Sequence, residues 1–160
     1  MPKLEHTLDE FEDMGAFTIT GSLGIGETEI QHELPVAAGA WRAYFLDADS
    51  FQYDDDEEPD EYPPSQLLLV REGASPPPAL QELRADLALK MSIEAARFMA
   101  VDSSMKSELA TTDGFHAHLD GVHGVLANKK GVHVALGGDG SASVWRPSDP
   151  RAGWILINLA

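Results

Sequence analysis

The chain has 160 residues, of which 43% are hydrophobic and 24% are charged. This length and composition predict a single domain spanning residues 1–160 that can bury its own core. The absence of cysteine excludes disulfides, thiolate metal sites and a cysteine nucleophile. No apolar run is long enough for a membrane helix, and the acidic first residues lack the apolar region of a secretory signal. We therefore expect a soluble cytoplasmic protein.

Acidic residues dominate the charge and concentrate in the first part of the chain. The net charge is -16, from 27 acidic and 11 basic residues. Residues 1–61 contain 17 acidic residues against two basic ones, Lys3 and Arg42. A field of this sign repels phosphate, so it argues against nucleic acids and anionic membranes and permits a basic protein partner or a bound cation. The plainer interpretation is that the acids only keep the protein soluble.

The N-terminal third predicts a short helix followed by strands. The apolar spacing in residues 3–14 suits one or two helical turns with Thr7 as a possible N-cap, or else an extended arm. From Gly15 the apolar period becomes two, which indicates strands over 16–22 and 27–34 with a glycine-containing turn between them. Residues 40–47 are rich in aromatics and predict a well-buried strand.

The middle of the chain predicts a loop, a central strand and a segment with two interpretations. Residues 47–64 carry nine acids, three prolines and no base, which predicts a mobile solvated loop. Residues 65–72 form a continuous apolar run typical of a central strand. Strict alternation over 86–94 predicts a strand, although a helix over 79–98 is the alternative. A strand over 97–102 should precede a short helix that ends near Thr111.

The last thirty residues predict three strands, over 132–136, 141–146 and 154–159. Gly137 to Gly140 reads GGDG and predicts a tight hairpin between the first two. In total the chain predicts seven to nine strands and one or two short helices. The expected fold is mainly β, an antiparallel β-sandwich or partly open barrel, with an α+β fold as the alternative.

Four residues make the best candidate metal site. They are His116, His118, Asp120 and His123. On a strand His116, His118 and Asp120 would share one face, where imidazole and carboxylate groups can bind a divalent transition metal such as zinc or iron. An H-x-H pair without a longer motif is also common among surface histidines. We expect no cofactor, with a divalent metal at this cluster as the alternative.

Acidic and aromatic residues of the 47–64 loop are the candidate partner-binding residues. They are Asp47, Asp49, Phe51, Tyr53, Asp54, Asp55, Asp56, Glu57, Glu58, Asp60, Glu61 and Tyr62. Aromatic residues embedded in acids are typical of segments that bind a protein partner. A calcium loop is the other interpretation, but the spacing of an EF-hand is missing.

Two further motifs resemble catalytic ones. Ser103 to Lys106 matches S-x-x-K, but the companion motifs of serine enzymes that use this lysine are absent, and a helix start explains the residues. Gly21 to Gly26 resembles a phosphate loop, but no helical pattern or lysine follows, so a turn is expected. These motifs give no catalytic residues, and we expect that the protein is not an enzyme.

The C-terminal pattern GVHVAL, GGDG, SASVW and WILINL resembles that of small uncharacterised bacterial β-rich proteins of unknown function, which have a Gly-Asp-Gly hairpin near the C-terminus. The resemblance covers about half of the chain and implies no activity. Small acidic bacterial proteins of this kind are sometimes immunity proteins that neutralise a toxin, and the charge of this chain is compatible with that role.

These features predict a non-catalytic protein-binding module that engages a basic partner through its acidic N-terminal half. Two alternatives remain. The first is a metal-dependent enzyme or metal-binding module that uses the histidine cluster. The second is a structural subunit that self-associates through an edge of the closing sheet.

Overall fold

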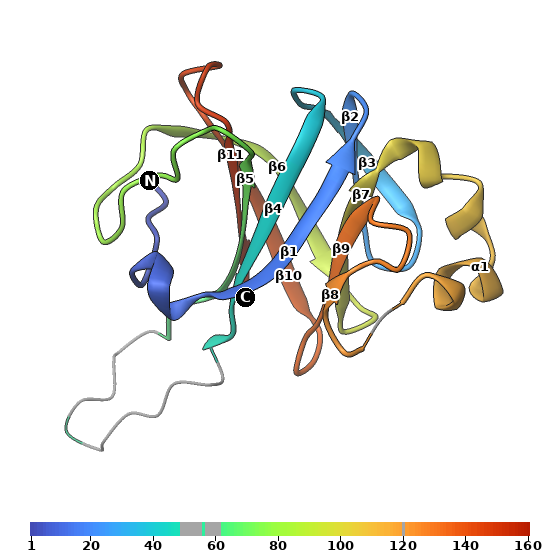
Figure 1. Ribbon diagram of the computed structural model, residues 1–160. Coiled ribbons are helices and arrows are strands. Elements are labelled where there is room, and N and C mark those ends of the chain that lie inside the picture. Colours follow the sequence, from blue (N-terminus) through green and yellow to red (C-terminus); the bar gives the residue numbers. More distant parts are fainter. Residues whose placement is uncertain (49–55, 57–61, 120) are drawn as a thin grey trace.

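The computed structural model describes residues 1–48, 56, 62–119 and 121–160, which form two antiparallel sheets packed face to face (Figure 1). The larger sheet has the order β1-β4-β5-β11-β10-β6 and the smaller one the order β3-β2-β7-β9-β8. The strands of the larger sheet are β1 Glu12–Ile19, β4 Gly39–Leu46, β5 Ser65–Arg71, β6 Ala85–Ile93, β10 Gly140–Pro147 and β11 Trp154–Leu159. Those of the smaller sheet are β2 Ser22–Gly26, β3 Ile30–Pro35, β7 Arg97–Asp102, β8 Gly124–Val125 and β9 Gly131–Ala135. The expected mainly β, sandwich-like fold is confirmed.

Helical structure is short. One α-helix, α1 Thr112–Ala117, and the 3-10 turns η1 Leu8–Glu10, η3 Ser103–Met105 and η4 Glu108–Ala110 are present in the described residues. Thr7 occupies the N-cap position of η1, but its side chain makes no capping hydrogen bond. The helix expected up to Thr111 is therefore wrong, since two separate 3-10 turns take its place. No helix of the described part of the chain is long and apolar enough to cross a membrane.

Strand β5 explains why residues 65–72 read as one apolar run. It lies inside the larger sheet, paired with β4 on one side and β11 on the other. Leu67 and Leu69 point into the core between the sheets, whereas Leu68 and Val70 belong to a second apolar cluster on the outer face. Because both faces are buried, polar alternation is lost, as expected for a central strand. The strand interpretation of 86–94 is also confirmed, by β6.

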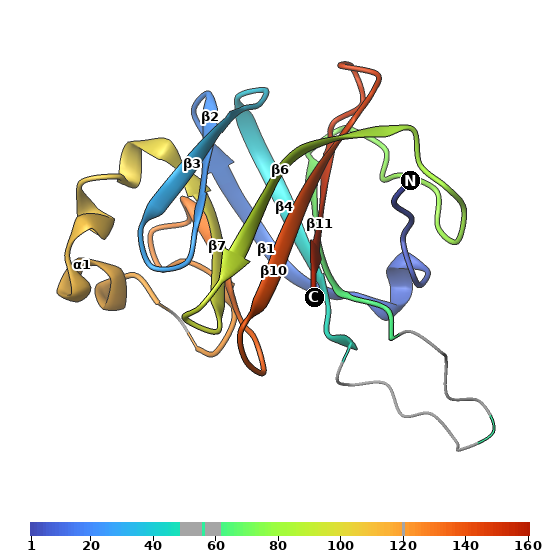
Figure 2. The same cartoon turned by 180° about the vertical axis from the view of Figure 1, so that it is seen from behind.

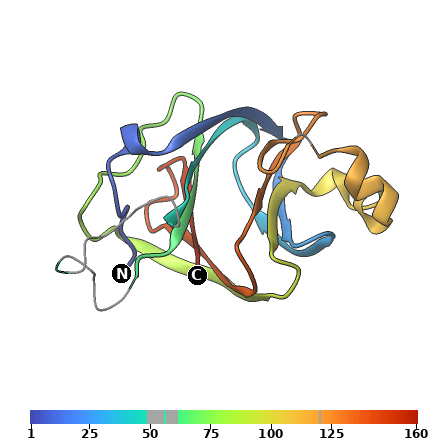
Figure 3. The same ribbon diagram turned by 90° about the horizontal axis from the view of Figure 1, so that it is seen from below.

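The outer faces of both sheets are covered, so the molecule has three apolar layers. Leu4, Phe11 and Leu83 come from the N-terminal segment and the 72–84 connection and pack on the outside of the larger sheet. Met105 and Leu109 come from η3 and η4 and pack on the outside of the smaller sheet. Seen from below, the helical segment lies beyond the smaller sheet, on the side away from the larger one (Figure 3). Burial on both faces lets the sheets keep many apolar side chains from water.

A buried glutamine fixes the N-terminal segment to the larger sheet. Gln66 is 0% exposed. Its amide nitrogen donates to the Lys3 carbonyl at 2.8 Å and to Asn158 Oδ1 at 2.9 Å, and its oxygen accepts from the Glu5 N–H at 2.9 Å. Since these bonds satisfy both donors and the acceptor, burial of this polar side chain carries little penalty.

The C-terminal connections differ from the expectation. β9 pairs with β7 and β8, whereas β10 pairs with β11 and β6, so the segment from Leu136 to Asp139 crosses between the sheets. The expected Gly-Asp-Gly hairpin is therefore wrong. Glycine allows tight backbone turns, which a crossover between sheets needs as much as a hairpin does. The glycines alone therefore do not distinguish a crossover from a hairpin. The turn expected over Gly21–Gly26 is wrong in the same way, because Gly24 and Gly26 lie inside β2.

Candidate functional site

Acidic side chains gather where the strands of the larger sheet meet the 47–64 segment. The antiparallel register brings together the end of β4 at Leu46, the start of β5 at Ser65 and the end of β11 at Leu159. We call this the loop end of the larger sheet. Glu12 lies there because it pairs with Phe45 near the end of β4. Asp47 directly follows β4. Glu94 directly follows β6, Asp139 directly precedes β10, and both are exposed.

The opposite end of the same sheet is different in charge. Arginines lie near the strand termini there, at positions 71, 84, 146 and 151, together with acids at positions 72, 82, 86 and 149. The two signs are balanced at that end. Cations near the loop end include Lys3, held beside Gln66, Arg97 at the start of β7, and Arg42, which reaches Asp13 next to Glu12 at 3.0 Å. Because of the strand register, the acidic residues that concentrate in part of the sequence are in excess at one end of the molecule, and the electrostatic field is most negative there.

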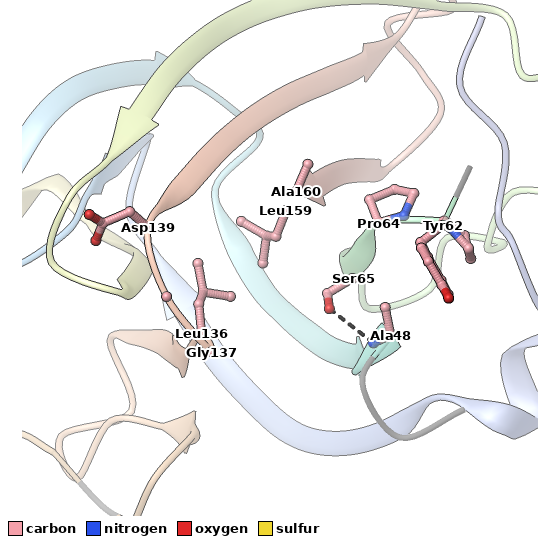
Figure 4. Close-up of a pocket in the computed structure, with 11 residues that line it drawn as sticks. Ala48, Tyr62, Pro64, Ser65, Leu136, Gly137, Asp139, Leu159 and Ala160 are labelled. Atoms are coloured by element: carbon pink, nitrogen blue, oxygen red, sulfur yellow. Dashed lines mark hydrogen bonds between the residues drawn. The ribbon is translucent and has the colours of Figure 1, made fainter. Parts of the chain in front are cut away.

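A hollow of about 520 Å³ opens at the loop end (Figure 4). It lies between the start of β5 and the crossover from β9 to β10, and its lining combines apolar and polar groups. Its lining includes Tyr62, Pro64, Leu136, Asp139 and Leu159. A hydrogen bond of 2.9 Å from the Ala48 N–H to Ser65 Oγ closes the base of the 47–64 segment beside it. Apolar lining residues together with the Asp139 carboxylate suit the stem and charged head of a lysine or arginine side chain.

The structure places three of the twelve candidate partner-binding residues. Asp47 and Asp56 are exposed, and Tyr62 is 60% exposed at the rim of the hollow. The nine others, Asp49, Phe51, Tyr53, Asp54, Asp55, Glu57, Glu58, Asp60 and Glu61, lie outside the described residues. The expected loop therefore begins and ends at the loop end of the larger sheet.

The histidines of the candidate metal site are distributed over different contacts. His116 lies in α1, so the first two histidines do not have the strand geometry in which they would share one face. His118 Nε2 is 3.5 Å from Glu108 Oε1, and His123 Nε2 is 2.8 Å from Glu12 Oε2. No group of three or more metal-ligating side chains forms among the described residues, and Asp120 lies outside them. Contacts with glutamates of separate elements are typical of surface ion pairs.

A hydroxyl-rich cluster around a buried carboxylate was not singled out by the sequence. Asp102 is 1% exposed and accepts hydrogen bonds from Thr20 Oγ1 at 2.9 Å and from Ser104 Oγ at 2.7 Å. Burial would raise the pKa of Asp102, but the bonds from Ser104 and Thr20 outweigh it and lower this pKa below its ordinary value. The Ser103 hydroxyl bonds the Ser22 hydroxyl. This cluster joins the corner between β1 and β2 to the end of β7, which is a structural role.

A scan against protein-family models found no match, and searches of the curated proteins and of the solved structures found none either.

Proposed function

We propose that the protein is a non-catalytic binding module that engages a basic protein partner at the loop end of the larger sheet. The observation that carries this proposal is the charge separation along that sheet. Glu12, Asp47, Glu94 and Asp139 lie at the loop end, whereas charges at the opposite end are balanced. An excess of one sign at one end steers a partner of opposite sign into a defined orientation.

The hollow at the same end supplies an apolar contact that charge alone lacks. Tyr62 and Pro64 on one side and Leu136 and Leu159 on the other offer surface to the stem of a basic side chain. Tyrosine at the rim of a pocket is a frequent source of binding energy in protein interfaces. In this proposal the acidic and aromatic residues of 47–62 also take part in binding, and immunity-type binding of a basic toxin is one role that the module would serve.

The experiment is a titration of the isotopically labelled protein with hexalysine, followed by amide chemical shifts at low and at physiological ionic strength. We expect shifts concentrated at residues next to Asp47, Tyr62 and Asp139, and a steep loss of affinity with added salt because exposed charges are screened. Shifts spread evenly over both ends of the sheet would refute the proposal, since they would indicate attraction to net charge alone. Binding that does not depend on salt would refute its electrostatic basis.

A further inference from the structure

In the part of the chain that the structure describes, four strands border the two sheets, and three of them have features that hinder the pairing of another strand. β8 has only two residues in the described part of the chain. β3 ends in Pro35 and carries a bulge. β1 is bulged near Met14, and the N–H of Thr18 donates at 2.9 Å to the carbonyl of Lys129, in the connection between β8 and β9. Bulges, prolines and short lengths are common means of protecting sheet edges.

The fourth border strand, β6, is open over part of its length. Within the described residues it pairs with β10 alone, and it crosses the front of the molecule in Figure 2. A bulge at Ala88 interrupts its first half, but pairing is regular from Leu89 to Ile93. No proline occurs in this stretch, and Lys90 and Ser92 are exposed. The charge of Lys90 is a protecting feature of this stretch, since lysine is common on protected edges, but its regular backbone without proline remains a template for another strand.

The hydrogen-bond register shows which backbone groups this edge presents. Ser141 of β10 donates to and accepts from Ala160, so its backbone groups point toward β11. In an antiparallel ladder the next residue, Ala142, therefore points toward β6, where its partner is Met91. It follows that the N–H and C=O groups of Lys90 and Ser92 point away from β10. The N–H of Glu94, two residues further on, bonds the side chain of Glu27, which agrees with this direction.

We propose that the edge of β6 from Leu89 to Ile93 takes up an extended segment of the basic partner as an added strand. The backbone groups of Lys90 and Ser92 would bond it, and its inward side chains would cover Leu89 and Met91 at the border of the core. The segment should therefore have an apolar inward face, a neutral residue beside Lys90 and its basic residues elsewhere on the outward face, because like charges on neighbouring strands repel. A second copy of this chain fits less well, because two copies with a net charge of -16 each repel. This inference rests on the proposed function for the charge of the partner.

The test uses a short acetylated peptide in which valine alternates with lysine, except for one serine placed to lie beside Lys90, and measures amide hydrogen exchange residue by residue. We expect the amides of Lys90 and Ser92 to become protected on binding, whereas those of Met91 and Ile93, which face β10, are already slow. Ser92→Pro removes one outward N–H without removing a bond to β10 and should weaken binding about tenfold, whereas Ser92→Ala keeps the N–H and should bind normally. Equal melting temperatures of the two variants establish that both are folded.

The outcomes separate this inference from the proposed function. Binding of the peptide without protection at Lys90 and Ser92, or equal binding by both variants, overturns strand addition and leaves the proposed function in place. If a valine–glutamate peptide protects the amides of Lys90 and Ser92 equally well, the partner segment need not be basic. That result also refutes the role that the proposed function gives to charge. Absence of binding by either peptide, or formation of a dimer through β6, overturns the inference as stated.

Discussion

The substitution Asp102→Asn tests the role assigned to the buried carboxylate. It keeps the size of the side chain, removes its charge and replaces one acceptor oxygen by a donor. The hydroxyl groups of Thr20 and Ser104, which both donate to the Asp102 carboxylate, then have one acceptor oxygen fewer. Water cannot easily replace it, because Asp102 is 1% exposed. Hydrogen bonds to a charged group contribute about 1.5–3 kcal/mol each, and the remaining amide oxygen retains one of them. We therefore expect the free energy of unfolding to fall by about 2 kcal/mol.

The loss should depend on pH in a defined direction. The pKa of Asp102 lies below its ordinary value of 3.8, because hydrogen bonds outweigh burial. Ionised Asp102 therefore stabilises the folded state fully above about pH 4 to 5, and this contribution disappears as the pH falls through the lowered pKa. The difference between the variant and the natural protein should be largest at neutral pH and should become smaller under acid conditions.

Urea denaturation of both proteins at neutral pH and near pH 3 measures this difference. A loss of about 2 kcal/mol corresponds to a melting temperature lower by about 4–8 °C in a domain of this size. Asp86→Asn is the control, because Asp86 is exposed and lies at the opposite end of the sheet from Asp139. An equal loss at both pH values, or a loss no larger than that of the control, would refute the role of the carboxylate.

Three further predictions concern the fold and the histidines. Gln66→Leu should lower the free energy of unfolding by about 3 kcal/mol in urea, because it leaves buried polar groups without partners, and a neutral effect would contradict this role. Gly131→Ala should lower the melting temperature, because the added Cβ would lie 2.6 Å from a backbone atom of β7. Gly138→Ala is the control and should leave the melting temperature unchanged, because its added Cβ meets open space. Equal melting temperatures of the two variants would contradict the close packing of Gly131 against β7. Zinc or a chelator should leave the melting temperature unchanged, because His118 and His123 contact glutamates of separate elements. A rise with zinc would restore the metal-site interpretation.

The sequence predicted two kinds of strand well: a strand buried on both faces, which reads as a continuous apolar run, and a strand buried on one face, which reads as an alternation of apolar and polar residues. The run around Leu68 indicated a central strand because apolar residues on both faces leave no other pattern, and β5 is central. Alternation over 86–94 prevailed over helical propensity because β6 buries Met91 and Ile93 against the core. Tertiary burial of one face outweighs intrinsic preferences of a few tenths of a kcal/mol per residue.

The sequence did not predict how the strands are joined. Gly137 to Asp139 has the composition of a hairpin turn, yet it crosses between the sheets, because the partner of β10 is decided by burial of Val144 and Ala142 in the core. Similarly, the excess of acid was evident from composition, but its gathering at one end depends on the register between β4, β5 and β11. Register is a long-range property, and local residue patterns restrict it only weakly.

The site around Asp102 was missed for a related reason. Thr20 and Ser104 lie 82 and two residues from this aspartate in the sequence, and the long separation hides the contact. A buried acid among serines looks like a helix cap when only its neighbours are considered. Its position at the end of an apolar strand, FMAVD, was the one available signal that the carboxylate is buried.

The most direct measurement of the central claim compares two double variants of equal net charge for binding to hexalysine. One variant, Asp47→Asn with Asp139→Asn, neutralises two acids at the loop end, and the other, Glu82→Gln with Asp86→Asn, neutralises two acids at the opposite end. We predict that the first variant binds about fivefold more weakly than the second at low ionic strength, because each exposed charge contributes up to about 1 kcal/mol only where the partner lies. Equal affinities would contradict the account, because they would mean that total charge, and not its position at the loop end, determines binding.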